Sequence, residues 1–468
     1  MNTQSRRRHN LSQVIAAFVL HARLKNIPRA VRETAMLHLL DGFATMLGGV
    51  NEEASRRMRR HLLNLGGKGA ATVVGTKWKL PAQHAALANG VQGHVLDYDD
   101  SQLTTFPSRP LGQQTHPTAP VLAAALALAE TTRATGREFL TAYIVGVEVA
   151  CRLGDAIDPG HYLDGFHPTG TLCTFGATTA CAHLLKLNQQ QIGWALGIAG
   201  TLASGIRANR GTMAKALNAG RAAENGVVAA TLAQRGFTAT TDVFNDPMGF
   251  FSAACRNKVD KRLLKFGSPF FFEKPGVAIK LYPCPGVLHP MLDRLLNLVK
   301  RHDLRAEQIK AIRITMSPEA ALPLVYDRPT DGLQARFSAP FTAAVAITDR
   351  AMGLGQFTDA KVRDRRVRTL MKRVEVIRRS GPRDRRINRR TEVEILGYDG
   401  GRLKGNATSA RGHPTRPTSR LEIEEKFHQC AGGRLTATAI DRFISGVWSV
   451  ERVSSVARWL RPLRVSRR

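Results

Sequence analysis

Three carboxylates crowd into four residues of the segment 93–101, which reads GHVLDYDDS. They are Asp97, Asp99 and Asp100, and like charges at this spacing raise the pKa of at least one carboxyl group. Such a group suits a site that manages a proton or a cation. A solvent-exposed acidic turn is the simpler interpretation, and the spacing alone favours it. A divalent metal site is a further alternative, because hard cations bind oxygen clusters.

Histidine and lysine recur beside glycine and proline further along the chain. His116 and His167 each precede a proline, and Lys215 follows the triplet 211–213, which reads GTM. A single histidine or lysine is more often a structural or exposed residue than a catalyst. Two His-Pro pairs between apolar segments favour proton transfer, because imidazole is the natural proton carrier near neutral pH.

A fourth cluster begins at Lys280 and combines an ammonium, a phenol, a thiol and an imidazole within ten residues. The other three groups belong to Tyr282, Cys284 and His289. The cluster lies where the texture of the sequence changes, and ligand clefts commonly form at such domain junctions. Cys284 has no base near it in the sequence, so we interpret it as a structural thiol rather than a nucleophile.

Helices must position most of these groups, because the first 250 residues are rich in alanine and apolar residues. The patterns predict helices over 121–130 and 138–153, and Asn188 with Gln191 has the spacing of a capping box at the start of another. Two further helices are predicted within 435–459. These segments carry little polar surface, so we expect the helices to be buried against one another.

Strands are predicted after residue 275. Apolar and polar residues alternate over 312–316 and again over 392–395, where the second run precedes a turn at 399–401, which reads DGG. We therefore predict a mainly α fold: a large all-helical domain formed by residues 1–275 and 426–468, and a smaller inserted α+β lid domain formed by residues 276–425.

The 468 residues carry 68 Lys and Arg against 37 Asp and Glu, a formal net charge of +31. A basic chain can bind polyanions or attract small anions. Residues 361–390 contain fourteen basic and three acidic residues but no Phe, Tyr or Trp. Without aromatic side chains on which bases could stack, this stretch is interpreted as a solvated face of the lid, and nucleic-acid binding is not expected.

The six cysteines are sparse and form no C-x-x-C pair, so we expect a reduced, cytoplasmic protein without a disulfide scaffold. No apolar run reaches 18 residues, so no membrane association is expected. The basic residues Arg6–Arg8 precede an apolar stretch, but Ser12 and Gln13 interrupt it, and we predict no cleaved signal.

Taken in order along the chain, these motifs resemble the MmgE/PrpD superfamily, which comprises 2-methylcitrate dehydratases and their relatives cis-aconitate decarboxylase and iminodisuccinate epimerase. The resemblance rests on the segments 39–49, 94–101, 116–117, 165–170, 215–223, 280–289, 335–338 and 424–427. It implies a helical first domain, a smaller α+β lid and a homodimer. It also implies catalysis without an organic cofactor or an iron–sulfur cluster, and we assign no metal ligand.

The resemblance places six residues at the catalytic pocket: Asp97, Ser101, His116, His167, Lys215 and Lys280. Tyr326 is a looser candidate from the lid. We predict catalytic roles for Asp97, His116, His167, Lys215 and Lys280, and substrate-binding roles for Ser101, Arg221, Tyr282, His289 and Tyr326. The sequence departs from the family pattern, in which a threonine often precedes the histidine by about six residues. Here Ser101 and His116 are separated by fifteen residues, so a longer loop over 102–115 is expected.

The predicted function is that of a cofactor-independent carbon–oxygen lyase, a dehydratase acting on a small di- or tricarboxylate such as 2-methylcitrate. Lysines would hold the carboxylates, and the remaining groups would move protons beside a carboxylate. Which group acts as base and which as acid stays open. Two alternatives remain: a decarboxylase or epimerase on the same fold, as in cis-aconitate decarboxylase or iminodisuccinate epimerase, and a non-catalytic, basic nucleic-acid-binding protein.

Overall fold

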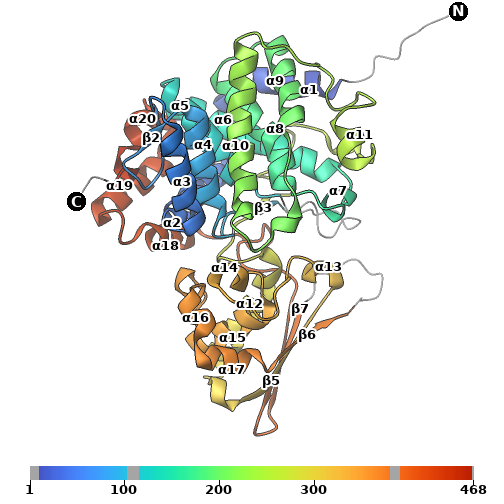
Figure 1. Cartoon of the computed structure of the whole chain (residues 1–468), viewed down its shortest axis with the longest axis vertical. Helices are drawn as coiled ribbons and strands as arrows, with labels where there is room; N and C mark the ends of the chain where they lie inside the picture. The colour runs from blue at the N-terminus through green and yellow to red at the C-terminus, as the bar shows by residue number, and fades with distance from the viewer. Residues whose placement is uncertain (1–9, 103–114, 380–390, 466–468) are drawn as a thin grey trace, which may run out of the picture.

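Helices make up most of the chain and form the larger, upper body in Figure 1. The computed structural model describes residues 10–102, 115–379 and 391–465. The helices of this body are α1 (Leu11–His21), α2 (Arg29–Gly49), α3 (Glu53–Leu65), α4 (Ala82–His94), α5 (Thr118–Thr131), α6 (Gly136–Ala156), α7 (Gly160–Leu163), α8 (Pro168–Leu184), α9 (Gln189–Leu202), α10 (Ala214–Gln234), α11 (Phe250–Cys255), α18 (Arg420–Ala431), α19 (Ala437–Trp448) and α20 (Val456–Trp459). The prediction of a mainly α fold is confirmed.

The alanine-rich segments became buried helices because small side chains let helix backbones approach closely. Every residue of α5 from Thr118 to Glu130 is buried. The closest approach that matters for the site is between α4 and α10, where a Cβ atom on Gly90 would lie 2.8 Å from the Cα atom of Gly220. This crossing sets the end of α4 beside the start of α10.

The predicted helices and their signals are confirmed within the larger body. The segments 121–130 and 138–153 lie inside α5 and α6. Asn188 and Gln191 form the capping box at the start of α9, with each backbone N–H donating to the other side chain at 2.9 and 3.1 Å. The segment 435–459 contains α19 and α20.

A four-stranded sheet organises the smaller, lower body in Figure 1. Its strand order is β6-β5-β7-β8, with β6 parallel to β5 and both other pairs antiparallel. The strands are β5 (Ile309–Met316), β6 (Val374–Arg378), β7 (Thr391–Gly397) and β8 (Arg402–Ala407), and the accompanying helices are α12 (His289–Arg301), α13 (Pro318–Ala321), α14 (Gly332–Ala335), α15 (Ala339–Asp349), α16 (Asp359–Arg363) and α17 (Arg365–Met371). The predicted alternation is confirmed, since Ile312, Ile314 and Met316 are buried on one face of β5.

Two large hydrophobic cores, apart from a small cluster of Ala150, Cys173 and Ala222, divide the described chain. One contains buried residues from Leu11 to Ile279 and again from Ile423 to Leu463, and the other contains buried residues from Tyr282 to Ile395. The chain returns to the larger body through α18, which packs against α2. The last helices are therefore part of the first core. The smaller body is inserted in the chain between the first and last segments of the larger body.

Two short strand pairs complete the fold. One pairs β1 (Ala71–Thr72) with β2 (Lys79–Leu80), and the other pairs β3 (Ser101–Gln102) with β4 (Val277–Ala278). The second pair ties the segment after the acidic cluster to the connection that leads into the smaller body. The site residues before β3 and after β4 thereby become neighbours.

Three other sequence expectations concern the cysteines, membrane-spanning helices and the basic stretch. The six cysteines are free and buried. Within the described ranges, no helix is both long and apolar enough to cross a membrane. The basic stretch enters α16, α17 and β6, where Arg363 and Arg366 keep about 70% of their side chains exposed. Its remainder, 380–390, and the basic N-terminal residues 6–8 lie outside the described residues.

Candidate active site

The acidic segment after α4 is buried, so the expectation of a solvent-exposed turn is wrong. Asp97 is 3% exposed, and Asp99 and Asp100 are fully buried. Buried carboxylates require partners, and each of the three finds a different one on an element distant in the sequence or at the end of α4. The three carboxylates therefore do not converge on one cation.

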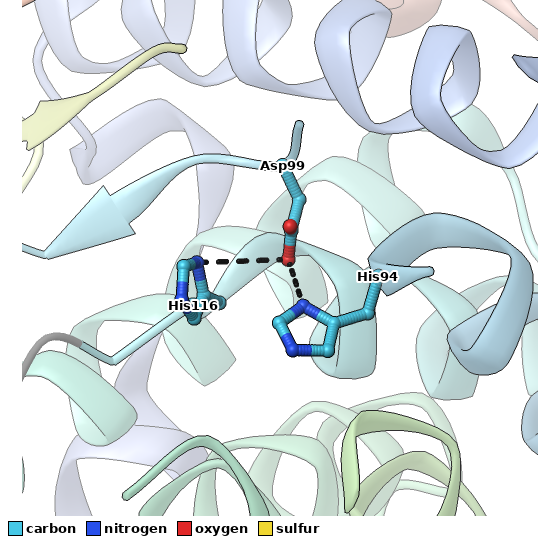
Figure 2. Close-up of side chains that lie close together, drawn as sticks. All are labelled: His94, Asp99 and His116. Atoms are coloured by element: carbon cyan, nitrogen blue, oxygen red, sulfur yellow. Dashed lines mark hydrogen bonds and ion pairs between the residues drawn. The ribbon is translucent and has the colours of Figure 1, made fainter. Parts of the chain in front are cut away.

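Asp99 and Asp100 hold the local structure around three histidines. Asp100 accepts hydrogen bonds from His38 Nδ1 at 2.8 Å and from the backbone and side chain of Thr118. Asp99 Oδ2 accepts from His94 Nδ1 at 2.8 Å and lies 3.8 Å from His116 Nδ1, as Figure 2 shows. These two carboxylates orient neighbouring side chains.

The trio of His94, Asp99 and His116 has the residue types of a metal site, with candidate ligand atoms within 4.8 Å of one another. Hydrogen bonding already uses the facing nitrogens. His94 Nδ1 donates to Asp99, and His116 Nδ1 lies 2.7 Å from the backbone oxygen of Asp100, which only accepts. Both nitrogens therefore carry protons in this arrangement, whereas a metal ligand must offer a lone pair. The geometry fits a hydrogen-bonded cluster better than a metal centre.

Asp97 bridges two lysines from different parts of the chain. Its Oδ1 accepts from Lys280 Nζ at 2.9 Å and from Lys215 Nζ at 3.1 Å. The backbone of Asp97 has a φ of +50°, a left-handed conformation that Asp tolerates and that turns the chain sharply after α4. Burial opposes ionisation, but the Lys215 and Lys280 ammonium groups hold the pKa of Asp97 well below its usual range. Two ammonium groups share one carboxylate, which leaves an excess positive charge.

His94, at the end of α4, was not among the predicted site residues, yet it links the two halves of the cluster. Its Nδ1 proton is committed to Asp99, so its Nε2 lone pair accepts from Lys215 Nζ at 2.9 Å. Burial and the nearby Lys215 charge hold the pKa of His94 well below its usual value. A neutral His94 therefore orients the Lys215 ammonium.

His116 presents its second ring nitrogen as a lone pair. Because Nδ1 donates to the Asp100 backbone oxygen, Nε2 is unprotonated in the neutral ring. Burial and the charge of Lys280 hold the pKa of His116 well below its usual value. Ser101 Oγ lies 3.2 Å from Nδ1, and the backbone N–H of Gln102 donates to the oxygen of Thr115 at 2.7 Å. The fifteen-residue separation thus still brings Ser101 and His116 together, although 103–114 lie outside the described residues.

His167 has the opposite tautomer. Asn218 Nδ2 lies 3.2 Å from His167 Nδ1 and also donates to the oxygen of Ile206 at 3.4 Å, which identifies it as the amide nitrogen. His167 Nδ1 therefore accepts, and the proton of the neutral ring sits on Nε2. Burial and Lys215 hold the pKa of His167 well below its usual value. The cluster thus contains one imidazole with a free lone pair and one with a proton to donate.

A cavity of about 190 Å³ opens beside these groups, at the junction of the two bodies. Seven predicted site residues line it: Asp97, Ser101, His116, His167, Lys215, Lys280 and His289. His289 donates from Nε2 to the oxygen of Cys284 at 3.1 Å, and burial lowers its pKa to about 4. Cys284 is fully buried, and burial raises the pKa of its thiol, in keeping with a structural role.

The structure does not bring Arg221, Tyr282 or Tyr326 into this lining. Arg221 lies on another face of α10 from Lys215 and pairs with Glu224. The hydroxyl of Tyr282 donates to Asp293 at 2.6 Å within the smaller body. The side chain of Arg221 ends at Glu224 and that of Tyr282 at Asp293, so neither is part of the lining, and their substrate-binding roles stay predictions.

Tyr326 is not in the cavity lining but contacts residues next to it. Its ring packs against Gly211, and its hydroxyl donates to the oxygen of Arg210 at 3.4 Å. Arg210 itself lines the cavity, as does Arg207. Sequence reasoning missed both arginines, although they lie only a few residues before Lys215.

Fold and site together define a mainly helical, two-domain enzyme whose cavity, lined by charged and histidine side chains, lies between a large helical domain and a smaller domain built on a sheet. The chain belongs to the MmgE/PrpD family: the MmgE/PrpD N-terminal domain matches residues 13–262, and the C-terminal domain matches residues 282–451. The predicted family resemblance is confirmed.

Curated relatives carry one activity in their names. The chain is 28% identical to human cis-aconitate decarboxylase over 388 residues, which cover 80% of this chain and 77% of the relative. It is 24% identical to the mouse cis-aconitate decarboxylase over 94% of this chain and 91% of the relative. It is 27% identical to the Aspergillus terreus cis-aconitate decarboxylase over 71% of each. These relatives favour the decarboxylase alternative over the dehydratase that was predicted first.

Proposed function

We propose that this protein is a carboxy-lyase that removes carbon dioxide from a small tricarboxylate of the cis-aconitate type. The observation that carries the proposal is the excess positive charge of Lys215 and Lys280 on Asp97, beside two neutral histidines of opposite tautomer in one cavity. The similarity to cis-aconitate decarboxylases over most of the chain supports the choice of substrate.

The lysines would hold a substrate carboxylate. A carboxylate that leaves water needs charged hydrogen-bond donors, and such bonds are stronger than neutral ones. Lys280 already spends one proton on Asp97 Oδ1 and one on the Asp97 backbone oxygen at 3.0 Å. Lys215 has a 13% exposed side chain on the cavity side and bonds to Asp97 and His94. We assign the direct substrate contact mainly to Lys215.

His167 would supply the proton. Loss of carbon dioxide leaves an electron pair on carbon, and a new C–H bond must form where that charge settles. His167 carries its proton on Nε2 and would deliver it to that carbon. The neighbouring Lys215 ammonium would stabilise the imidazolate left behind until water reprotonates it. Nearby ammonium groups would stabilise the anionic transition state. In this assignment Asn218 is a positioning residue, since it acts through the tautomer of His167.

Dehydration remains the second candidate because His116 offers a lone pair at Nε2. Elimination of water requires both a base for the C–H proton and an acid for the departing hydroxyl, whereas decarboxylation requires only proton delivery to carbon. His116 and His167 would provide the two roles. A 2-methylcitrate dehydratase, and with it a place in propionate metabolism, therefore stays a specific alternative.

Product analysis tests the proposal. The purified protein would be incubated separately with cis-aconitate, 2-methylcitrate, citrate and iminodisuccinate, and proton NMR would follow alkene formation, loss of carbon dioxide and stereoinversion. We expect loss of carbon dioxide from cis-aconitate at the highest rate. Water loss from 2-methylcitrate alone would replace the proposal with the dehydratase. No turnover, together with salt-sensitive retardation of DNA, would favour the nucleic-acid-binding alternative.

We also propose that the enzyme is a cytoplasmic homodimer that works without metal or organic cofactor, as the family resemblance implies. Light scattering coupled to gel filtration should give twice the chain mass of 51.2 kDa. Turnover should survive a chelator. Stimulation by an added divalent metal, lost again on chelation, would revive a metal role for the acidic segment.

A further inference from the structure

Arg207 and Arg210 form a second cationic group on the wall of the cavity. Arg207 is the first residue of the short 3₁₀ turn Arg207–Asn209, and Arg210 follows it directly. The turn lies between α9 and α10, just before Lys215. Arg207 is 8% exposed; its guanidinium stacks 3.4 Å from the ring centre of Tyr162, and it also donates to the Tyr162 backbone oxygen. Arg210 donates to the oxygen of Leu322 in the smaller body at 3.2 Å.

Neither guanidinium has a counter-charge among the described residues. No described carboxylate lies within 4 Å of the charged nitrogens of Arg207 or Arg210, and the Nε atom of each is buried without a hydrogen-bond partner. Burial and the neighbouring Arg210 both lower the pKa of Arg207. Other buried arginines in this structure are compensated: Arg152, for example, pairs with Glu148 at 2.9 Å.

Two adjacent, uncompensated guanidinium groups on a cavity wall are costly unless an anion joins them. A planar guanidinium binds a carboxylate through two parallel hydrogen bonds, so the chemistry favours a carboxylate. Stacking on Tyr162 fixes the plane of Arg207 in advance, which reduces the entropy lost on binding. Lys215 and Lys280 lie on the same cavity, where their excess charge suits a different carboxylate.

We infer that Arg207 and Arg210 form a second carboxylate subsite, separate from the lysines at Asp97, which selects substrates with two or more carboxylates. This inference rests on the proposed function, because it takes the cavity to be the binding site of a carboxylate substrate. The subsite makes Arg207 and Arg210 specificity residues rather than catalytic ones. The short turn before α10 would then bind substrate, a role that no sequence motif predicted.

Calorimetric binding tests the subsite without turnover. The probes are propane-1,2,3-tricarboxylate and butanoate, and the quantity measured is the ratio of their dissociation constants. Wild type should prefer the tricarboxylate. Arg210→Gln should reduce this preference at least about tenfold. The tricarboxylate loses a partner for its second carboxylate, whereas the single carboxylate of butanoate can still bind at the lysines. Arg210→Lys should keep part of the preference, since it retains the charge but loses the planar contact.

Arg235→Gln is the matched control, since Arg235 is exposed at the far end of α10 and should leave both affinities unchanged. Arg207→Gln should act like Arg210→Gln; if its stacking on Tyr162 proves necessary for folding, Arg210 alone decides the matter. An unchanged preference in Arg210→Gln would overturn the inference. Arginine-dependent tricarboxylate binding without turnover of cis-aconitate would retain the subsite and reject the proposed function.

Discussion

Two buried aspartates form ion pairs with lysines, but their surroundings and their balance of charge differ. Asp41 on α2 lies 2.5 Å from Lys426 on α18, with both side chains almost wholly buried. Asp97 lies 2.9 Å from Lys280 and 3.1 Å from Lys215. The residue types are the same, but the first pair lies in the interior between helices and the second group borders a cavity.

The balance of charge distinguishes the two. Lys426 matches Asp41 one to one and places its other protons on the backbone oxygens of Tyr98 and Lys280, each at 2.8 Å. The Lys426 ammonium thus faces one carboxylate and two backbone oxygens, which ties the site segments to α2 and α18. At Asp97 two ammonium groups face one carboxylate, and the excess is available to a ligand. Balanced, enclosed charge stabilises the fold, whereas the excess charge beside the cavity is what a substrate carboxylate would bind under the proposed function.

The largest effect is expected from breaking the enclosed pair. Lys426→Met leaves Asp41 buried without its partner, which should lower the free energy of unfolding by about 3–5 kcal/mol. Chemical denaturation followed by circular dichroism would measure it. Lys310→Met, on an exposed position of β5, is the control and should change stability little. Wild-type stability in Lys426→Met would contradict the stabilising role of the Asp41–Lys426 pair, and with it the contrast to Asp97.

The two aspartates should also differ in the sign of their pH dependence. Burial raises the pKa of Asp41 to about 6 against the opposing charge of Lys426, whereas the pKa of Asp97 lies well below its usual range. Between about pH 4 and 6 folded Asp41 binds more protons than unfolded Asp41, so its contribution to stability falls as pH rises through this range. The stabilising contribution of Asp97 is instead present above about pH 4 and is lost under more acidic conditions.

Asp41→Asn isolates this effect. The unfolding free energy of wild type minus that of the variant should fall by about 3 kcal/mol between pH 3 and 7, because the pKa of Asp41 is about 6 in the folded state and about 4 in the unfolded one. Denaturation curves at half-unit pH intervals would provide the comparison. A difference that stays constant or grows with pH would contradict the raised pKa.

A somewhat smaller effect is expected at the cavity histidines. His167→Ala should lower kcat for the preferred substrate at least about a hundredfold, or about 2.7 kcal/mol in activation free energy, with the fold preserved. His116→Ala should lower it as far if the reaction is a dehydration and less if it is a decarboxylation. His61→Ala, on an exposed position of α3, serves as the control. Unchanged rates in both cavity variants would remove the assigned roles.

Local signals in the sequence were sufficient for much of the fold. The capping box at Asn188 and the alternation over 312–316 involve residues within a few positions of one another, and both predictions are confirmed. Helical periodicity alone also places Arg221 away from Lys215. It lies six residues beyond Lys215, about 1.7 helical turns, and therefore on another face of α10.

Contacts between distant segments limited the prediction of the site. The acidic segment looked exposed because its partners are remote: Lys215 is 118 residues from Asp97, and Lys280 is 183 residues away. The role of His94 was missed for the same reason, since it depends on Lys215. The order of the motifs carried the family resemblance, but only the crossing of α4 with α10 shows which side chains meet.

Lys215→Met tests substrate binding by the excess charge at Asp97 most directly. It would be measured for kcat/KM with cis-aconitate and for thermal stability in the same preparation, beside Lys426→Met. Because Lys215 borders the cavity, we expect kcat/KM to fall at least about a hundredfold with little change in melting temperature. Lys426→Met should show the large loss of stability. A folded Lys215→Met enzyme with wild-type kcat/KM would contradict the claim that the excess charge at Asp97 binds the substrate.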